Sequence, residues 1–327
     1  MERTALPVLR GQLIARRQKL ESATLSRSRS DDVMRLLEEV DAALLRMDTG
    51  MFGLCDACGD PIEAERLLAD PLTRFCLDHL TAREQRALEQ DLDLAARIQR
   101  ELLPKRDSQV EGWDVAYHYQ PAGLVSGDYC DLIRGVSGDA YVLVGDVAGK
   151  GVAAAMLMSH LSAMLRALLS VGLPLAQLIE RASRVFCEST LPAHYATLVC
   201  GRASMSGEIE ICNAGHPPPL VLRAGGEVER VEATGLPIGM FSSERFLSTT
   251  LRIAPGETLL FYTDGVVEAQ DATGEEYGIE RLSTVAASVA TLPPTPFIER
   301  CIRDLAAFAG MRPRADDVTI MAVRRSR

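Results

Sequence analysis

The stretch SGDYCDLIRGVSGDAYVLVGD, residues 126–146, decides the fold of this chain. Two β-like runs flank the turn signal GVSGD, so the stretch predicts an antiparallel hairpin. If the hairpin is centred on Ser137, Asp128 faces Asp146 across the two strands. Directly opposed side chains share a face with Cβ atoms about 5 Å apart, and two like charges there are destabilising. A divalent cation between them would remove the repulsion, and an all-oxygen ligand set suits Mg²⁺ or Mn²⁺.

The segment that follows, DVAGKGVAAAMLM (residues 146–158), has the outline of a phosphate-binding loop. A Walker loop needs four residues between its first glycine and the Gly-Lys pair, followed by Ser or Thr. Here only three residues separate Gly145 from Gly149, and Gly151 follows Lys150. The acid at the mouth of the turn would also repel a phosphate, so the loop favours a cation. The alternative is that the two hairpin acids are solvated turn residues.

Two later segments add further acids to this pattern. In LLFYTDGVVE (residues 259–268), the apolar strand-like part ends at Asp264. In RADDVTIMAV (residues 314–323), the apolar part begins directly after Asp316 and Asp317. If these runs are antiparallel neighbours, the end of one strand lies beside the start of the other. All of these acids can then share one edge of the sheets. A carboxylate-lined site of this kind commonly holds two ions about 3.5–4 Å apart.

The composition sets limits on the function. A net charge of −10 over 327 residues argues against direct nucleic-acid binding. The richest apolar region, near residues 152–173, is interrupted by His160 and Arg166, so it indicates a buried helix and no membrane span. No signal peptide is visible, because the N-terminus lacks an apolar core. The clustered cysteines indicate metal binding in a reducing cytoplasm.

The pattern of periodicity divides the chain into three parts. Residues 1–81 comprise two helices that should form an antiparallel hairpin, followed by a cysteine-rich segment; residues 82–103 predict one continuous linker helix. From residue 104, short β-rich runs alternate with Gly and Pro, which predicts an α+β domain with antiparallel strands. Within that domain, helices are expected at about 151–171, 174–189 and 296–309.

The cysteine-rich segment predicts a zinc site. Cys55 and Cys58 have the spacing C-x2-C, and Cys76 and His79 repeat it after seventeen residues. Two such knuckles place four soft ligands around one tetrahedral Zn²⁺ with no open position, which is typical of a structural site. The alternative is a set of unrelated buried cysteines.

The helical hairpin with GLCDACGDPI (residues 53–62) resembles the DksA/TraR-type zinc-finger family over residues 1–81. In that family a coiled coil with acidic tip residues enters the secondary channel of RNA polymerase. Asp31 and Asp32 are the candidate tip acids here, and the fourth zinc ligand is His79 where the family usually has cysteine. The resemblance therefore implies a polymerase contact, with a dimerisation or sensing module as the alternative.

The remaining motifs resemble the metal-dependent PPM protein phosphatases, and within them the bacterial SpoIIE/RsbU-like branch. The matching segments, in the family's order, are DLAARIQRELLP, SGDYCD, GDVAGKGVAAAMLM, YATLVC, NAGHPPPLVL, GLPIG, LLFYTDGVVEA and DDVTIMAV. The resemblance implies a sandwich of two antiparallel sheets flanked by helices. It also implies two Mn²⁺ or Mg²⁺ ions and hydrolysis of phosphoserine or phosphothreonine on a protein, often a STAS-domain anti-anti-sigma factor.

The resemblance also implies roles for particular residues. Asp128, Asp146 and Asp264 are the catalytic metal-binding acids, helped by the backbone carbonyl of Val147. Either Asp316 or Asp317 is a further ligand, and Asp316 is favoured. The glycines expected to let the backbone approach the ions are Gly127, Gly149 and Gly265.

The implied mechanism uses a water that bridges two cations, loses a proton near neutral pH and attacks phosphorus in line. Many eukaryotic family members place a histidine in the loop after the second metal-binding acid, but here that loop reads DVAGKG. Water is therefore expected to protonate the leaving oxygen, with Lys150 as the alternative. His216 is expected to be structural. The cysteines expected to be core residues are Cys130, Cys187, Cys200, Cys212 and Cys301.

Two further expectations concern regulation and the competing function. The apolar stripe of residues 82–103 could pack on the next domain or on the same helix of a second copy in a homodimer. The helix could also couple the zinc finger to the helix after Gly151. The competing function is a non-catalytic protein that docks RNA polymerase or another partner through its zinc-finger hairpin.

Overall fold

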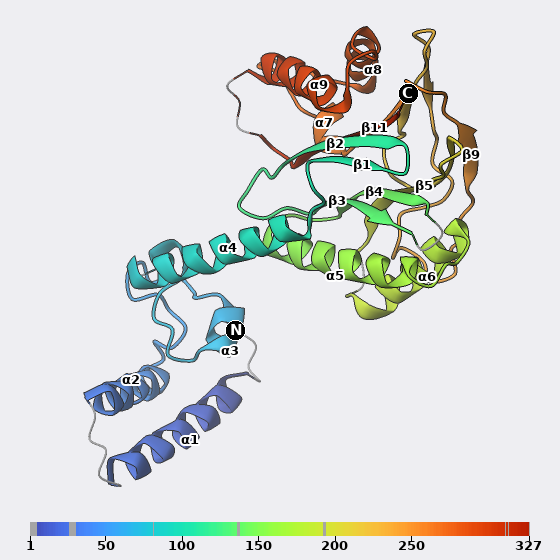
Figure 1. Cartoon of the computed structure of the whole chain (residues 1–327). Coiled ribbons are helices and arrows are strands. Elements are labelled where there is room, and N and C mark those ends of the chain that lie inside the picture. The colour runs from blue at the N-terminus through green and yellow to red at the C-terminus, as the bar shows by residue number, and fades with distance from the viewer. Residues whose placement is uncertain are drawn as a thin grey trace. The chain divides into compact units, whose positions relative to one another are not determined.

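A computed structural model describes residues 5–25, 31–80, 82–135, 138–191, 194–310, 312 and 314–326. The chain divides into two compact units, Met1–Asp91 and Leu92–Arg327, which we call the N-terminal and C-terminal units. The boundary lies within the long helix α4, Ala82–Leu102 (Figure 1).

The N-terminal unit begins with two antiparallel helices, α1 (Ala5–Leu25) and α2 (Asp31–Asp48). Arg10 pairs with Asp48 at 2.6 Å and Arg17 pairs with Asp41 at 2.8 Å, so the two chain directions are opposed, as predicted. Apolar residues at helical spacing bury one face of each helix. This small core comprises Leu9, Leu13, Val40, Ala43 and Met47. The hairpin tip at 26–30 and the side chains of Asp31 and Asp32, the candidate tip acids, lie outside the described residues.

The rest of the N-terminal unit is a compact knuckle with little regular structure. It contains α3 (Ala64–Ala69) and the 3₁₀ turn η1 (Leu77–His79). A tight turn follows Cys55, whose N–H bonds to the carbonyl of Asp60 and whose carbonyl accepts from Gly59, both at 2.8 Å. These bonds bend the chain so that Cys55 and Cys58 lie on the same side of the turn.

The C-terminal unit contains two antiparallel sheets, which confirms the predicted α+β class (Figure 1). One has the strand order β1-β2-β11-β10-β7-β8 and the other β3-β4-β5-β6-β9. The first comprises β1 (Asp107–Val110), β2 (Trp113–Gln120), β11 (Val318–Arg325), β10 (Thr258–Tyr262), β7 (Leu220–Leu222) and β8 (Val228–Arg230). The second comprises β3 (Asp128–Arg134), β4 (Ala140–Val147), β5 (Ala196–Ala203), β6 (Glu208–Ala214) and β9 (Thr249–Arg252).

The main core lies between the two sheets. Side chains from both inner faces interlock there, and they include Trp113, Val144, Ile211, Phe261 and Met321. Strands β4 and β10 are buried on both faces, because helices cover the outer sides of the sheets. This double burial explains why their sequences are continuous apolar runs that end abruptly in an acid.

Helices form the two outer layers of the sandwich. Helices α5 (Gly151–Leu169) and α6 (Leu175–Ser189) pack on β3, β4 and β6, while α8 (Ile279–Ser288) and α9 (Pro294–Ala309) pack on β2, β7 and β11. The short helix α7 (Asp264–Val267) follows β10. Among the described residues, α5 alone is long and apolar enough to cross a membrane, but Met158, Leu161 and Leu165 are almost fully buried in the protein core. It is therefore a core helix.

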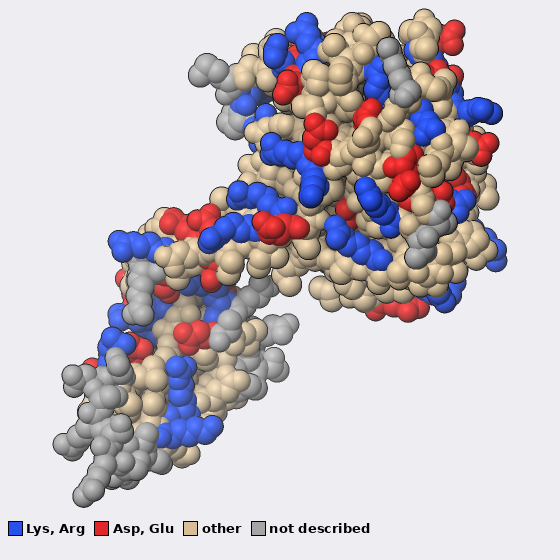
Figure 2. All heavy atoms as spheres, viewed as in Figure 1, with Lys and Arg blue, Asp and Glu red and all other residues tan. Residues whose placement is uncertain are grey.

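The sequence predicted α5, α6 and α9 to within two residues at each end, but it did not predict α7 or α8. The sequence of α8, IERLSTVAAS, is short and rich in Ser, Thr and Val, which are weaker helix formers. Figure 2 shows basic and acidic side chains interspersed over one face of the C-terminal unit.

Candidate metal centres

Strands β3 and β4 pair in the predicted register. Asp128 is the partner of Asp146, and the pairing continues without a bulge to Arg134 and Ala140. The predicted central residue, Ser137, lies outside the described residues, but the strands on either side fix the register. The two carboxylates therefore leave the same face of the sheet at its edge.

The second pair of acids comes from β10 and β11, which are antiparallel neighbours as predicted. Tyr262 is paired with Ile320, and one step further the N–H of Thr263 donates to the carbonyl of Thr319 at 3.0 Å. Asp264 therefore follows the end of β10 at the point where Asp316 and Asp317 precede β11. Although these acids are about fifty residues apart in the chain, the pairing makes them neighbours.

Two threonines join these acids to the other sheet. The hydroxyls of Thr263 and Thr319 both donate to Oδ2 of Asp128, the first at 2.9 Å. Because Asp128 belongs to the five-stranded sheet and the threonines to the six-stranded sheet, these bonds hold the two acidic edges together. The acids Asp128, Asp146, Asp264, Asp316 and Asp317 therefore gather at one end of the sandwich; we call them the acidic edge.

Three carboxyl groups of the acidic edge, those of Asp128, Asp146 and Asp264, have raised pKa values, since they are largely buried and lie close to other acids. Burial, and then repulsion from Asp146, raise the pKa of the Asp128 carboxyl well above its usual value. Burial, with repulsion from Asp264 and Asp316, raises the pKa of Asp146 to about 7. Burial and Asp316 also raise the pKa of Asp264. Closely spaced buried acids of this kind are a hallmark of a cation or catalytic site.

Asp316 and Asp317 have different surroundings. Both carboxylate oxygens of Asp317 accept backbone N–H groups, from Ala122 at 2.7 Å and from Gly127 at 3.0 Å. Asp316 accepts from the ammonium of Lys150 at 2.9 Å, and this pair is largely exposed. Asp316 also accepts the backbone N–H of Asp317 at 3.0 Å, but only through Oδ1, and its Oδ2 meets only the exposed ammonium of Lys150. Since both oxygens of Asp317 are held by backbone N–H groups, the surroundings favour Asp316 as the metal ligand.

Two of the three predicted glycines lie in tight spaces. A Cβ on Gly127 would lie 3.0 Å from the carbonyl oxygen of Val147 and 3.2 Å from Oδ1 of Asp146. A Cβ on Gly265 would collide with the backbone carbonyl of Asp317. Gly149 differs, because its Cβ would meet nothing within 4 Å; its φ of +110° is what favours glycine there.

His216 lies close to the acidic edge, because its hydrogen-bond partner Thr197 is the strand partner of Asp146. His216 is buried and its Nδ1 lies 2.9 Å from the hydroxyl of Thr197; burial lowers the pKa of its imidazole to about 3. It is therefore a neutral packing residue, as predicted. Of the five cysteines predicted to be core residues, four are buried and Cys187 is half-buried.

The zinc knuckle of the N-terminal unit brings its four predicted ligands together. The donor atoms of Cys55, Cys58, Cys76 and His79 all lie within 4.8 Å of one another. The Sγ of Cys76 is 3.8 Å from that of Cys58 and 3.3 Å from Nδ1 of His79. Burial opposes ionisation of Cys55, yet backbone N–H groups, led by that of Cys76, lower the pKa of its thiol to about 6. Three thiols and one imidazole fit a tetrahedral Zn²⁺.

The acidic edge fits a different class of ion. Its donors are all carboxylate or carbonyl oxygens, which suit Mg²⁺ and Mn²⁺ and not soft metals. Within the described part of the chain, the zinc knuckle is the one set of three or more His, Cys, Asp or Glu donors that all lie within 4.8 Å of one another. The carboxylates at the acidic edge are therefore more widely spaced than the zinc ligands.

Sequence reasoning missed several residues that support the acidic edge. Gln99 is buried and bonds twice to the backbone of Ser126: its amide donates to the carbonyl at 2.6 Å, and its Oε1 accepts the N–H at 3.0 Å. The hydroxyl of Ser126 in turn accepts the N–H of Asp128 at 3.1 Å. The two threonines were also missed, although Thr263 directly precedes Asp264 and Thr319 is two residues after Asp317 in the sequence. Only the fold reveals the Gln99 contact, because 27 residues separate the partners.

The two-sheet sandwich with helical outer layers and an acidic edge defines the class of PPM-type phosphatase folds. Residues 137–326 match the Stage II sporulation protein E (SpoIIE) family, and the chain belongs to this family. Residues 50–78 match the prokaryotic dksA/traR C4-type zinc finger.

Several known relatives share part of this chain. Protein IcfG of Synechocystis is 29% identical over 267 residues, covering 72% of this chain and 42% of IcfG. Phosphoserine phosphatase RsbU of Bacillus subtilis is 24% identical over 200 residues, covering 60% of this chain and 59% of RsbU. The RNA polymerase-binding transcription factor DksA of Haemophilus influenzae is 36% identical over 66 residues, covering 20% of this chain and 46% of DksA. The chain thus spans about half the length of the curated relatives it matches.

A solved structure resembles the C-terminal unit. The RsbU and RsbW domains of Rv1364c from Mycobacterium tuberculosis share 32% identity with a TM-score of 0.60, covering 68% of this chain and 63% of that one. The SiaA-PP2C domain of Pseudomonas aeruginosa has a TM-score of 0.66 at 22% identity, covering 75% and 99% respectively, which shows the fold alone.

Proposed function

We propose that this chain is a Mn²⁺- or Mg²⁺-dependent phosphatase that hydrolyses phosphoserine or phosphothreonine on a protein. The observation that carries the proposal is the meeting of Asp128, Asp146, Asp264 and Asp316 at the acidic edge. Membership of the SpoIIE family and the likeness to a phosphoserine phosphatase support the same reaction.

The chain's own residues have distinct tasks in this proposal. Asp146, Asp264 and Asp316, with Asp128 and the carbonyl of Val147, would hold two divalent ions. Those ions would neutralise the phosphoryl oxygens and make a water molecule a stronger nucleophile near neutral pH. Thr263 and Thr319 fix the orientation of Asp128, and Asp317 anchors the backbone before it. Lys150 can leave Asp316 because the pair is exposed, and it is then free to face the substrate or leaving oxygen.

A regulatory protein in the cytoplasm is the substrate that we propose, and a STAS-type anti-anti-sigma factor is the class we favour. The support is the likeness to RsbU and to the Rv1364c structure, which joins an RsbU domain to an RsbW domain. Proteomic comparison of cells with and without this chain should reveal the phosphoprotein that accumulates. A phosphoprotein outside the STAS class would overturn this part of the proposal.

The decisive test of the reaction uses p-nitrophenyl phosphate, which needs no protein docking. Wild type should hydrolyse it with Mn²⁺ but not after chelation. Asp146→Ala should lower kcat/KM by about a thousandfold, because loss of a metal ligand removes several kcal/mol of transition-state stabilisation. Equal rates for the two proteins would eliminate the enzyme proposal.

We also propose that helix α4 contributes to a homodimer. Three of its apolar side chains, Leu88, Leu94 and Ile98, are each about half exposed. Leu94 and Ile98 are four residues apart and share one face of the helix, and a contiguous exposed apolar patch is typical of an association surface. Sedimentation of wild type and of Leu94→Glu/Ile98→Glu should give a dimer and a monomer; two identical monomers would refute this pairing.

The competing proposal is a non-catalytic protein that docks RNA polymerase through the zinc-finger hairpin. The likeness to DksA over 66 residues supports it. Binding of the full chain to purified polymerase, with no metal-dependent hydrolysis by the same preparation, would favour this function over the phosphatase.

A further inference from the structure

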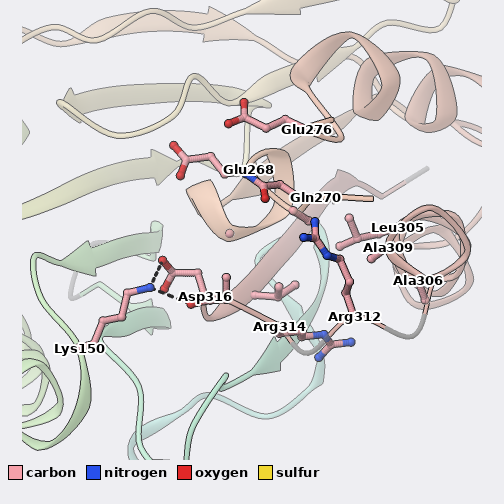
Figure 3. A pocket seen from close by; sticks show the side chains of 14 residues that line it. Lys150, Glu268, Gln270, Glu276, Leu305, Ala306, Ala309, Arg312, Arg314 and Asp316 are labelled. Carbon is pink, nitrogen blue, oxygen red and sulfur yellow. Dashed lines mark hydrogen bonds and ion pairs between the residues drawn. The ribbon is translucent and has the colours of Figure 1, made fainter. Parts of the chain in front are cut away.

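A second recess adjoins the acidic edge, and nothing in the proposed reaction uses most of it. It has a volume of about 440 Å³, within the range typical of ligand pockets. Lys150, Gly265 and Asp316 form the side shared with the acidic edge. Arg312 and Arg314, in the segment between α9 and β11, line the recess away from that side (Figure 3). We call this recess the arginine pocket.

The two arginines carry charges that their surroundings do not neutralise. Arg314 is exposed at the rim of the pocket and makes no hydrogen bond or ion pair with any residue that the structure describes. Arg312 donates to the backbone carbonyl of Asp271 at 2.6 Å, which leaves its charge without a carboxylate. A guanidinium that lines a pocket binds a carboxylate or phosphate best, because it can do so through two parallel hydrogen bonds.

The acids of the pocket do not serve as these partners. Figure 3 shows Glu268 and Glu276 on the opposite side of the pocket from the guanidinium of Arg314. Burial, followed by repulsion from Asp264, raises the pKa of Glu268, so this carboxyl lies within the electrostatic reach of the acidic edge. Cations bound at that edge would offset these acids and leave the arginine side with a net positive charge.

The position of the arginines separates them from the group that is hydrolysed. A phosphoryl group must reach the carboxylates at the acidic edge, where Lys150 pairs with Asp316. In Figure 3 the guanidinium of Arg314 points away from this pair. The arginines therefore face a neighbouring part of a bound substrate, and an extended chain places successive side chains only about 3.3 Å further along.

We propose that the arginine pocket binds an acidic side chain of the substrate protein, close in sequence to the phosphorylated residue. This inference rests on the proposed phosphatase function and assigns Arg312 and Arg314 as specificity-determining residues for it. A segment with aspartate or glutamate near the phosphoserine should be preferred over one with neutral neighbours. Substrates without such a residue would still reach the acidic edge.

The test compares phosphoserine peptides that carry one aspartate, scanned over the four positions on each side, with the all-alanine peptide. For wild type, kcat/KM should be about tenfold higher at one position at least, as expected for one partly exposed charge-assisted pair. Arg312→Gln/Arg314→Gln should abolish the preference and leave turnover of p-nitrophenyl phosphate unchanged. Arg314→Glu should favour the matching lysine peptide. Arg300→Gln, an exposed arginine of α9 outside the pocket, is the control.

Three outcomes would overturn the inference: no preference in wild type, an unchanged preference in the double variant, or an equal loss on peptides and on p-nitrophenyl phosphate. Fluorescence anisotropy of the labelled aspartate peptide gives a readout that does not need turnover. If wild type fails to hydrolyse p-nitrophenyl phosphate with Mn²⁺, the phosphatase proposal fails. Peptide binding that then depends on Arg312 and Arg314 would still support the pocket.

Discussion

The zinc knuckle and the acidic edge are both candidate metal centres, but the two sites reach their geometry differently. In the knuckle, four soft donors lie within 4.8 Å of one another before any ion is considered. At the acidic edge the oxygens are spread more widely, and threonines, backbone amides and one lysine hold them. The first site supplies the four donors that a tetrahedral Zn²⁺ needs. The second presents oxygens from several segments, with the Lys150 and Asp316 side chains exposed at its rim.

The difference follows from charge and from the role of each site in the fold. In the knuckle, backbone N–H groups stabilise the thiolate of Cys55 beside its neighbouring donors, whereas the buried carboxylates at the acidic edge repel one another. The knuckle has few other contacts, since its small core comprises Cys55, Ile62, Leu67 and Cys76. The acidic edge stands on a sandwich with a large core of its own. Removing metal should therefore unfold the first site and only empty the second.

Cys55→Ser tests this contrast with the largest expected effect. Structural Zn²⁺ contributes about 10–16 kcal/mol to folding in zinc-finger peptides, far more than this small core can replace. Zinc content should fall from one per chain to none, and amide exchange over residues 51–80 should become fast. Cys187→Ser, a half-buried cysteine of the C-terminal unit, is the matched control. Retained zinc and unchanged protection in Cys55→Ser would contradict a structural role.

Asp316→Asn and Asp317→Asn sharpen the account of the acidic edge. Asp316→Asn removes a proposed metal ligand, so kcat/KM should fall by about a thousandfold and Mn²⁺ affinity should fall with it. In Asp317→Asn, the new amide can still accept one backbone N–H through its oxygen. About a tenfold loss is expected there, which corresponds to one weakened hydrogen bond. The measurements are steady-state kinetics and Mn²⁺ binding by calorimetry; the reverse order would make Asp317 the ligand.

The zinc knuckle could be predicted from local spacing alone, because Cys55 to Cys58 and Cys76 to His79 each lie within one turn of chain. The pair Asp128 and Asp146 could also be predicted, since a hairpin register follows from its turn signal. The rest of the acidic edge required a guess that β10 and β11 are neighbours, which the pairing bears out. Contacts across 135 to 191 residues, such as those of Thr263 and Thr319 with Asp128, could not be predicted, because no local period encodes them.

Gln99→Leu tests whether the acidic edge depends on support from helix α4. The change leaves the buried N–H and carbonyl of Ser126 without their partners, each worth about 1–3 kcal/mol. The segment that leads into Asp128 should loosen, and the Mn²⁺ concentration for half-maximal activity should rise about tenfold. Gln90→Leu, an exposed glutamine on the same helix, should change neither this concentration nor Tm. If both variants need the same Mn²⁺ concentration for half-maximal activity, Gln99 has only a packing role.

The pH dependence of the metal-free C-terminal unit gives the most specific effect. Burial and neighbouring acids raise the pKa of Asp146 to about 7, against about 3.9 in an unfolded chain. Between these values the unfolded chain is ionised while the folded protein keeps the proton. Stability without metal should therefore fall as pH rises from about 4 to 7, and then level off.

Mn²⁺ binding should show the opposite trend, since the ion must displace that proton. Its affinity should rise with pH by up to about tenfold per unit below pH 7 and then become constant. Asp146→Asn cannot ionise, so its metal-free Tm should vary less over this range and exceed that of wild type at pH 7.5. Thermal unfolding of both proteins in chelator, from pH 5 to 8, measures this. A wild-type Tm that rises over this range would show that the carboxylates at the acidic edge do not repel one another, and the reason for expecting a cation there would be lost.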